Sequence, residues 1–464
     1  MNYKGTAGND DYTGTSSADT FNMTQGGDDT VSAGGGDDII NYGNALNAND
    51  KIDGGTGNDT LELSGDAYAH PVENLLDGVV NISKIVLGTG FSYELDEIDS
   101  NVAGGATMTI DASALGAQSQ LVFDGGLETD GKFIMTGGAG DDILEGGAGD
   151  DVLIGNDGND ILIGGGGHNT VSGGPGNDQI NLINPSAVDV ANGNAGDDLF
   201  FIESRLNPAT QINGGAGSNT MTFSTGANVF VTCNNTTFVN IQTIYFEGGG
   251  NVGFVTADGN VAAGATLVVN ATALTSSDKF TFNGSAETDG SFNITGGPGI
   301  DTITGGAQAD SLFGGNANDV LVGGGGNDTL FGGLGKDMLT GGAGHDTFQY
   351  ASVAQSSGPS FDIITDFSAA QDKFALTVGV AAINPTVTSG KLDSATFNVD
   401  LKQALGAAQL HAHDAVLFTP TTGSFAGDTF LVVDANGTAG YQAGADYVFE
   451  VNHLAGQLTT ANFG

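Results

Sequence analysis

A repeat of nine residues constrains this 464-residue chain more than any other feature of its sequence. The repeat reads G-G-x-G-x-D-x-U-x, where U is a large apolar residue. Residues 296–349 hold six consecutive units and residues 137–181 hold five, while a weaker set opens the chain and single copies surround Asp59 and Asp198. A tandem repeat this short predicts a solenoid in which each unit stacks on its neighbours.

The order of residues within the nonapeptide predicts a tight turn followed by a very short strand. Its glycines permit positive φ angles and a close approach of the backbone. The Asp closes the turn, and the x-U-x tail points one apolar side chain inward. Two units then make one coil of a flattened, parallel β-solenoid with a turn on each edge. Asp residues 18 positions apart therefore lie on the same edge of successive coils.

This stacking predicts pairs of carboxylates beside glycine carbonyl oxygens. Such a cage suits Ca²⁺, which takes roughly six to eight oxygen ligands, better than Mg²⁺. The predicted pairs are Asp301/Asp319, Asp310/Asp328, Asp319/Asp337 and Asp328/Asp346; Asp142/Asp160, Asp160/Asp178 and Asp151/Asn169; and Asp10/Asp29 and Asp19/Asp38, with Asp59 and Asp198 as further candidates. The amide of Asn169 is a weaker ligand, and one inserted residue leaves the register of the first set open. The alternative at each position is an Asp that only caps its turn.

The charge of the chain makes a cation necessary for folding. With 45 Asp and 10 Glu against 9 Lys and 1 Arg, the formal net charge is -45. A chain with this much charge and modest hydrophobicity does not fold by itself. The same acidity repels the phosphates of nucleic acids, so we expect no nucleic-acid partner. No apolar run approaches the length of about 18 residues that predicts insertion into a membrane.

A second, longer repeat relates the two halves of the chain. The segment Glu-Thr-Asp-Gly at 128–131 recurs at 287–290, and residues 106–115 match residues 265–274. We therefore predict an all-β chain with two tandem β-rich repeat units, 1–183 and 184–349, and a β-rich C-terminal capping region, 350–464. Helical periodicity is confined to about residues 399–410. The recurring Glu-Thr-Asp-Gly loops favour a turn that enters a strand, with Ca²⁺ binding as the alternative.

The sequence lacks two common hydrolase motifs, H-E-x-x-H and G-x-S-x-G. The single Cys233 favours a buried, inert thiol over a nucleophile. His411 and His413 lie on one face if they belong to a strand, and a structural role is favoured there over a transition-metal site. Since the repeats and the C-terminal region occupy nearly the whole length, we expect no enzyme activity.

The arrays resemble those of the RTX (repeats-in-toxin) family of exported bacterial proteins. Residues 361–367, FDIITDF, are similar to the segment that caps RTX arrays, and residues 427–437, GDTFLVVDANG, with the terminal LTTANF at 458–463, look like an uncleaved type I secretion signal, although Asn462 replaces the acidic residue that is common there. The resemblance implies a parallel β-roll, multiple Ca²⁺ ions, the type I secretion machinery as a partner, and an extracellular location with association to the cell surface. The N-terminus lacks a signal-peptide pattern, as this route implies. The duplicated units also resemble segments of RTX surface-layer proteins.

These observations favour one function over two alternatives. We expect a secreted structural protein that stays unfolded while Ca²⁺ is scarce and folds on binding Ca²⁺ outside the cell. The folded chain then forms a homo-oligomer or polymer in a surface layer, filament or extracellular matrix. The alternatives are a calcium-dependent adhesin or module that binds a cell-surface glycan, and an extracellular polysaccharide-modifying enzyme whose carboxylates escape motif searches.

Overall fold

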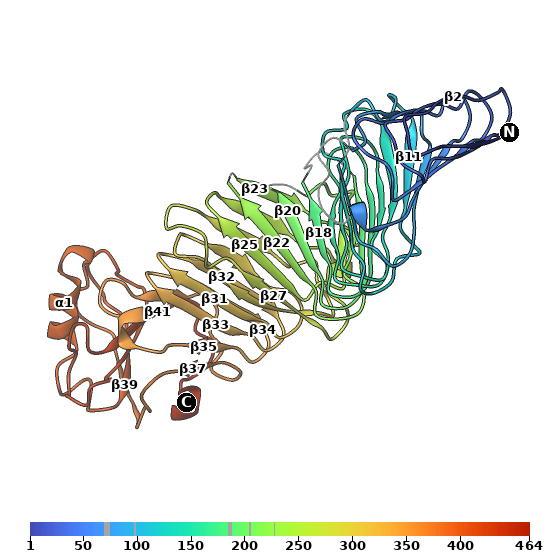
Figure 1. Ribbon diagram of the computed structural model, residues 1–464. Helices are drawn as coiled ribbons and strands as arrows, with labels where there is room; N and C mark the ends of the chain where they lie inside the picture. Colours follow the sequence, from blue (N-terminus) through green and yellow to red (C-terminus); the bar gives the residue numbers. More distant parts are fainter. Residues whose placement is uncertain (69–74, 97–98, 184–187, 204–205, 227) are drawn as a thin grey trace. The chain divides into compact units, whose positions relative to one another are not determined.

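The computed structural model describes residues 1–68, 75–96, 99–183, 188–203, 206–226 and 228–464. The chain divides into two compact units, of which unit 1 contains residues 1–223 and 236–241 and unit 2 contains residues 224–235 and 242–464. Both units are parallel β-solenoids, so the predicted all-β fold is confirmed (Figure 1). Among the described residues the one α-helix is α1 (Phe397–Ala404), which overlaps the first part of the region of helical periodicity, 399–410.

Each coil of unit 1 contributes strands to two faces. One face is a parallel sheet in the order β1 (Asn2–Lys4), β3 (Thr20–Asn22), β5 (Ile39–Gly43), β7 (Thr60–Leu63), β9 (Lys84–Leu87), β11 (Thr107–Asp111), β13 (Lys132–Thr136), β15 (Val152–Ile154), β17 (Thr170–Pro175), β19 (Val190–Ala195), β21 (Gln211–Asn213) and β24 (Phe238–Val239). The intervening strands are β2 (Asp11–Thr13), β4 (Thr30–Ser32), β6 (Lys51–Asp53) and β8 (Val79–Val80) in one sheet, and β10 (Tyr93–Asp96), β12 (Leu121–Asp124), β14 (Ile143–Glu145), β16 (Ile161–Ile163), β18 (Gln179–Leu182) and β20 (Leu199–Glu203) in another. β22 (Thr220–Thr225) contains the sequence boundary of the unit.

Unit 2 repeats this alternation. One run of parallel strands is β25 (Thr243–Gly248), β27 (Thr266–Asn270), β29 (Ser291–Thr295), β31 (Ser311–Asn316), β33 (Thr329–Leu334), β35 (Thr347–Gln349) and β37 (Lys373–Ala375). The other is β23 (Val229–Thr232), β26 (Val252–Val255), β28 (Phe280–Asn283), β30 (Thr302–Thr304), β32 (Val320–Gly325), β34 (Met338–Ala343) and β36 (Asp362–Ile364), continued by β41 (Tyr447–Val451), β40 (Phe430–Val433), β39 (Ala415–Phe418) and β38 (Ile383–Val387). Short 3-10 turns are η1 (Asp66–Tyr68), η2 (Asp258–Asn260), η3 (Val353–Gln355), η4 (Ser394–Thr396) and η5 (Thr460–Asn462).

The strand register shows that two nonapeptides make one coil. In array 137–181, Leu144 pairs with Leu162 and Leu162 with Ile180. In array 296–349, Leu321 pairs with Leu339. Each of these side chains is fully buried, and each is the U residue of its repeat. The apolar position therefore builds a narrow core of stacked aliphatic side chains, one from each turn.

The C-terminal region continues the solenoid of unit 2. β36 pairs with β34 and β37 pairs with β35, both in parallel, so the first strands after the array add to its two faces. β40 then pairs antiparallel with both β39 and β41. An aromatic-rich cluster forms the core of this region, made of Phe361, Leu392, Phe397, Leu401, Leu405, Leu410, Val416, Phe418, Phe430, Val432, Tyr441 and Val448.

The compact units do not follow the division drawn from the sequence at 183/184 and 349/350. Residues 350–464 share unit 2 with array 296–349, and unit 1 extends beyond residue 183. Since each coil of a solenoid contacts only its neighbours, a boundary between duplicated sequences need not be a boundary between contacts. The sequence division stays a prediction about how the chain was duplicated.

None of the helices in the described part of the chain is long and apolar enough to cross a membrane.

Truncating the stacked core tests this packing. Leu321→Ala removes a fully buried side chain between Ile303 and Leu339. We expect the free energy of unfolding to fall by about 2–5 kcal/mol, because the rigid coils close poorly around a cavity. Urea unfolding in saturating Ca²⁺ measures it. The control Val322→Ala changes the half-buried outward neighbour and should cost less than about 1 kcal/mol; equal effects of the two substitutions would contradict the assigned faces.

Candidate calcium sites

The aspartates of array 296–349 form a ladder along each edge of unit 2. The backbone N–H of each Asp donates to Oδ1 of the Asp one coil later. The N···O distances are 2.8 Å for Asp301/Asp319, Asp310/Asp328 and Asp319/Asp337 and 2.9 Å for Asp328/Asp346. All six residues are buried. The fixed hydrogen bond holds each carboxylate in one orientation, so its second oxygen, Oδ2, is placed by the fold as well.

Unit 1 contains the same ladder in the other two sets. Corresponding N–H to Oδ1 bonds join Asp142/Asp160 (2.8 Å), Asp151/Asn169 (2.9 Å), Asp160/Asp178 (2.9 Å), Asp10/Asp29 (2.9 Å) and Asp19/Asp38 (2.7 Å). The inserted residue of the first set is absorbed without loss of pairing. Asp59 and Asp198 continue the ladder, since Oδ1 of each accepts from Asp38 and Asp178 at 2.9 and 3.0 Å. The structure thus brings together every pair that the spacing predicted; their role as calcium ligands stays a prediction.

Four buried aspartates belong to the ladders although the nine-residue pattern does not reveal them. Asp50 accepts from Asp29, Asp189 from Asn169, Asp362 from Asp337, and Asp372 from Asp346, each through Oδ1. Their intervals are 21, 20, 25 and 26 residues instead of 18. These coils are longer than two nonapeptides, so a search for a fixed period misses the four aspartates. Asp362 and Asp372 end the two ladders of array 296–349, and Asp362 lies within the segment that resembles an RTX cap, residues 361–367.

The second carboxylate oxygen of most ladder residues is buried without a hydrogen-bond donor. Among the described residues this is true of Oδ2 in Asp29, Asp38, Asp59, Asp151, Asp160, Asp178, Asp198, Asp319, Asp328, Asp337, Asp346 and Asp362. An ionised oxygen that is buried and unpartnered is strongly destabilising unless a cation is beside it. The repetition of this arrangement from coil to coil is the feature that fits bound Ca²⁺ most directly.

The glycines leave room beside these oxygens. A Cβ atom added to Gly314 would lie 2.5 Å from Oδ2 of Asp319 and 2.6 Å from the carbonyl oxygen of Gly332, one coil later. A Cβ on Gly146 would meet Oδ2 of Asp151 at 2.5 Å and the Gly164 carbonyl at 2.7 Å. The first glycine of each repeat is therefore required by space, and the space that it opens is lined by hard oxygen atoms of the kind that Ca²⁺ prefers.

Burial also shifts the acidity of the ladder. It raises the pKa of Asp160 and Asp328 to about 7 and that of Asp319 to about 8, with the charges of adjacent ladder aspartates adding to the shift. The backbone N–H bonds to Oδ1 act in the opposite direction but do not offset burial. At neutral pH these buried aspartates thus resist ionisation. A divalent cation beside them would replace the stabilisation that water gives to an exposed carboxylate.

Two other sequence candidates do not gain a functional site. Cys233 is buried, and burial raises the pKa of its thiol to about 12, as expected for an inert residue. His411 and His413 precede β39 and do not lie on a strand, so the condition under which they would share one face is not met. Nδ1 of His411 lies 3.3 Å from Oδ2 of Asp414, and Asn384 contacts both residues.

Comparison with protein families agrees with this geometry. The family model of the RTX calcium-binding nonapeptide repeat matches residues 23–45, 44–67, 136–171, 154–182, 293–321 and 313–348. The chain is an RTX repeat protein. It binds several Ca²⁺ ions through its nonapeptide arrays. A comparison of the chain with curated proteins finds no match.

The raised pKa values predict how pH acts when chelator removes Ca²⁺. A carboxyl whose pKa is higher in the folded chain than in the unfolded chain stabilises the fold below its unfolded value of about 3.9. That contribution is lost as pH rises through the folded values of about 7 for Asp160 and Asp328 and about 8 for Asp319. In excess chelator, circular dichroism should therefore show more β-structure at pH 5 than at pH 8. Equal β content at the two values would contradict the assignment.

Removing one ladder charge tests the sites themselves. In Asp328→Asn the amide oxygen still accepts the Asp310 N–H, but the anionic Oδ2 is gone. We expect fewer Ca²⁺ ions per chain by calorimetry and a calcium midpoint of folding raised by on the order of tenfold or more. Asp157→Asn, which changes an exposed turn residue of array 137–181, is the control and should leave both values unchanged. The same change in both variants would mean that net charge, and not the ladder, governs binding.

Proposed function

We propose that this protein is a secreted structural protein whose folding is switched on by Ca²⁺ outside the cell and which then self-assembles. The observation that carries the switch is the repeated, buried and unpartnered Oδ2 of the ladder aspartates. Without a cation these carboxylates repel one another and lose their hydration, so the folded state is disfavoured. With Ca²⁺ each coil is joined to the next on both edges.

The magnitude of this effect is sufficient to control folding. For sites with a Kd of on the order of 10⁻⁴ M, typical of extracellular calcium modules, a tenfold excess of Ca²⁺ contributes about 1.4 kcal/mol per site. Several such sites together match the total stability of an ordinary domain, about 5–15 kcal/mol. Calcium binding and folding are then the same event.

Export through a type I system is part of the proposal. The RTX repeats support it, because proteins with these repeats are typically secreted by this route. The low net stability expected without Ca²⁺ also supports it, since an unfolded chain is competent for passage. An extracellular location supplies the ion that the ladders need.

Assembly into a surface layer, filament or matrix rests on the duplicated architecture and on sheet ends. The sheets end at strands such as β1 and β2 in unit 1 and β37 and β38 in unit 2. Terminal strands offer backbone groups to a second chain. A second copy of the chain that pairs with a terminal strand would continue the same sheet, so repeated pairing would produce a filament or layer.

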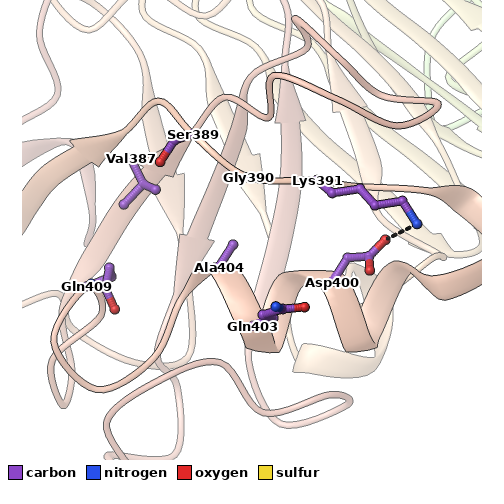
Figure 2. A pocket seen from close by; sticks show the side chains of 8 residues that line it. All are labelled: Val387, Ser389, Gly390, Lys391, Asp400, Gln403, Ala404 and Gln409. Carbon is purple, nitrogen blue, oxygen red and sulfur yellow. Dashed lines mark ion pairs between the residues drawn. The ribbon is translucent and has the colours of Figure 1, made fainter.

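A glycan-binding role and an enzyme role are less well supported. A cavity of about 350 Å³ in the C-terminal region is lined by Val387, Ser389, Gly390, Lys391, Asp400, Gln403, Ala404 and Gln409 (Figure 2). No aromatic side chain is among these lining residues to stack on a sugar. The carboxylate of Asp400 already accepts from Thr396 and from the Asp393 backbone and lies 3.7 Å from Lys391. We therefore propose that the chain carries out no catalysis.

Titration with Ca²⁺ tests folding and assembly separately. Circular dichroism should change from coil to β-structure between chelator and millimolar Ca²⁺, and electron microscopy should then show ordered arrays or filaments. An unchanged β spectrum in excess chelator at pH 8 would exclude the switch. A fully folded but strictly monomeric protein at millimolar Ca²⁺ would exclude self-assembly while leaving the switch intact, and binding on a glycan array would then favour the adhesin.

A further inference from the structure

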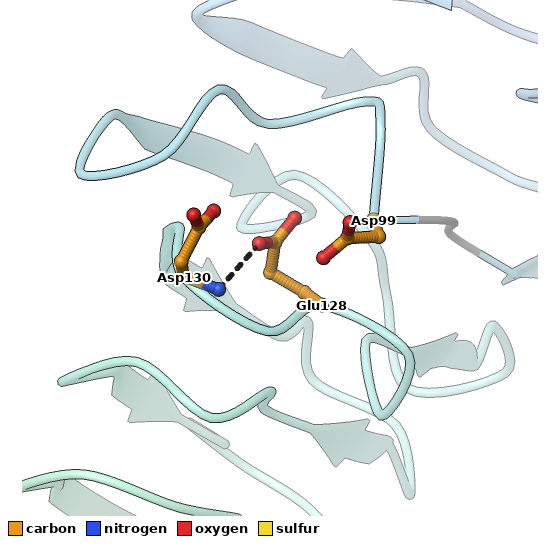
Figure 3. Close-up of side chains that lie close together, drawn as sticks. All are labelled: Asp99, Glu128 and Asp130. Atoms are coloured by element: carbon orange, nitrogen blue, oxygen red, sulfur yellow. Dashed lines mark hydrogen bonds between the residues drawn. The ribbon is translucent and has the colours of Figure 1, made fainter.

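Two groups of three carboxylates lie outside the nonapeptide arrays. In unit 1, Asp99, Glu128 and Asp130 each place a carboxylate oxygen within 4.8 Å of the others (Figure 3). In unit 2, Asp258, Glu287 and Asp289 do the same. The family matches cover residues 23–67, 136–182 and 293–348, and each triad falls in a gap between them, so neither triad is part of a matched repeat.

The central Glu of each triad has one oxygen that no donor among the described residues satisfies. Glu128 and Glu287 are 1% and 0% exposed. Oε1 of Glu128 accepts the N–H groups of Asp130 and Gly131 at 3.0 and 2.7 Å, and Oε1 of Glu287 accepts those of Asp289 and Gly290 at 3.2 and 2.9 Å. Oε2 of each Glu is buried and unpartnered. A turn that needed only a cap would be complete with Oε1.

The outer Asp of each triad comes from the preceding coil and is held in place by its own hydrogen bonds. Oδ1 of Asp99 accepts from both the N–H and the hydroxyl of Thr129. Oδ1 of Asp258 accepts from the N–H and the hydroxyl of Thr288, at 2.9 and 2.6 Å. These bonds join two successive coils and leave the second carboxylate oxygen of each Asp for another partner.

The last Asp of each triad is anchored through its backbone. The Asp130 carbonyl accepts the N–H of Gly105, and the Asp289 carbonyl accepts that of Gly264, each at 2.8 Å. In Figure 3 the three carboxylates of unit 1 lie side by side, with Glu128 between the two aspartates. Hydrogen bonds from the backbone and from Thr129 or Thr288 thus hold three carboxylates close together, although their negative charges repel one another.

We propose that each triad binds a Ca²⁺ ion. The ion would join the coils that precede an array, here called the spacer coils (residues 99–130 and 258–289), to the start of that array. All of the available ligand atoms are hard oxygens, with no His or Cys in either group, so the site favours Ca²⁺ over Zn²⁺ and other transition metals. The arrangement occurs in both units from equivalent residues of the long repeat, so it is a reproducible feature of the coil that precedes an array. These two ions are additional to those of the nonapeptide ladders.

Charge-removing substitutions that keep the hydrogen bonds test the proposal. In Asp99→Asn and Asp258→Asn the amide oxygen still accepts from Thr129 or Thr288, so only the charge is lost. We expect each single variant to bind one Ca²⁺ fewer than the parent chain by calorimetry and the double variant two fewer, with the same β spectrum in saturating Ca²⁺. The matched control Asp66→Asn with Glu247→Gln removes two exposed charges and should bind the parental number of ions.

A second pair of variants separates this site from the first nonapeptide site. The charge of Glu128 also acts on the nearby Asp151 of the ladder. Loss of ions in Glu128→Gln with Glu287→Gln, but none in Asp99→Asn with Asp258→Asn, would mean that each Glu serves the ladder, and would overturn the triad. An unchanged count in both pairs would overturn it too. If the double variants do not fold in Ca²⁺, the single variants decide by the same count, because each leaves the other unit intact.

Discussion

The structure depends on one arrangement of an Asp side chain, in which one carboxylate oxygen accepts a backbone N–H and the other lines the space proposed for Ca²⁺. The Oδ1 atom of a ladder residue such as Asp319 accepts an N–H from the preceding coil, which sets the register between coils. Its Oδ2 atom is left without a donor in a buried position. The same side chain therefore aligns the coils and, in the switch that we propose, makes their stacking dependent on Ca²⁺, because the hydrogen bond to Oδ1 does not satisfy the charge on Oδ2.

This arrangement explains why so thin a core is enough. Each coil buries few apolar side chains, such as Leu321 and Leu339 in array 296–349, and a small core seldom outweighs the entropy lost on folding. In the proposed switch, Ca²⁺ ions between the coils supply the remaining stability and cancel part of the negative charge. In the C-terminal region the aromatic-rich cluster around Phe361 and Phe430 provides a conventional hydrophobic core. Asp362, which follows Phe361 in the chain, ends one ladder of the array, and Asp372 ends the other.

The spacer coils extend the same principle with different residues. Glu128 and Glu287 each present one satisfied and one unsatisfied oxygen, as the ladder aspartates do. Here the backbone donors lie within the Glu loop itself, and the neighbouring coil contributes a carboxylate, Asp99 or Asp258, in place of a glycine carbonyl. If both proposals hold, arrays and spacer coils alike require cations, and the requirement extends along both units.

The sequence by itself determined the parallel solenoid, the inward apolar position and the pairs from Asp142/Asp160 to Asp328/Asp346, because a strict period of nine forces every second turn onto one edge. It named Asp10/Asp29 and Asp19/Asp38 as well, but their inserted residue left the register open until the fold showed them paired. It did not reveal Asp50, Asp189, Asp362 or Asp372, whose intervals of 20 to 26 residues hide them from a periodic search. Nor did it bring Asp99 to Glu128, since these residues meet only when two successive coils stack. Side chains related by the repeat are predictable from spacing alone, whereas those separated by loops of irregular length are brought together only by the tertiary fold.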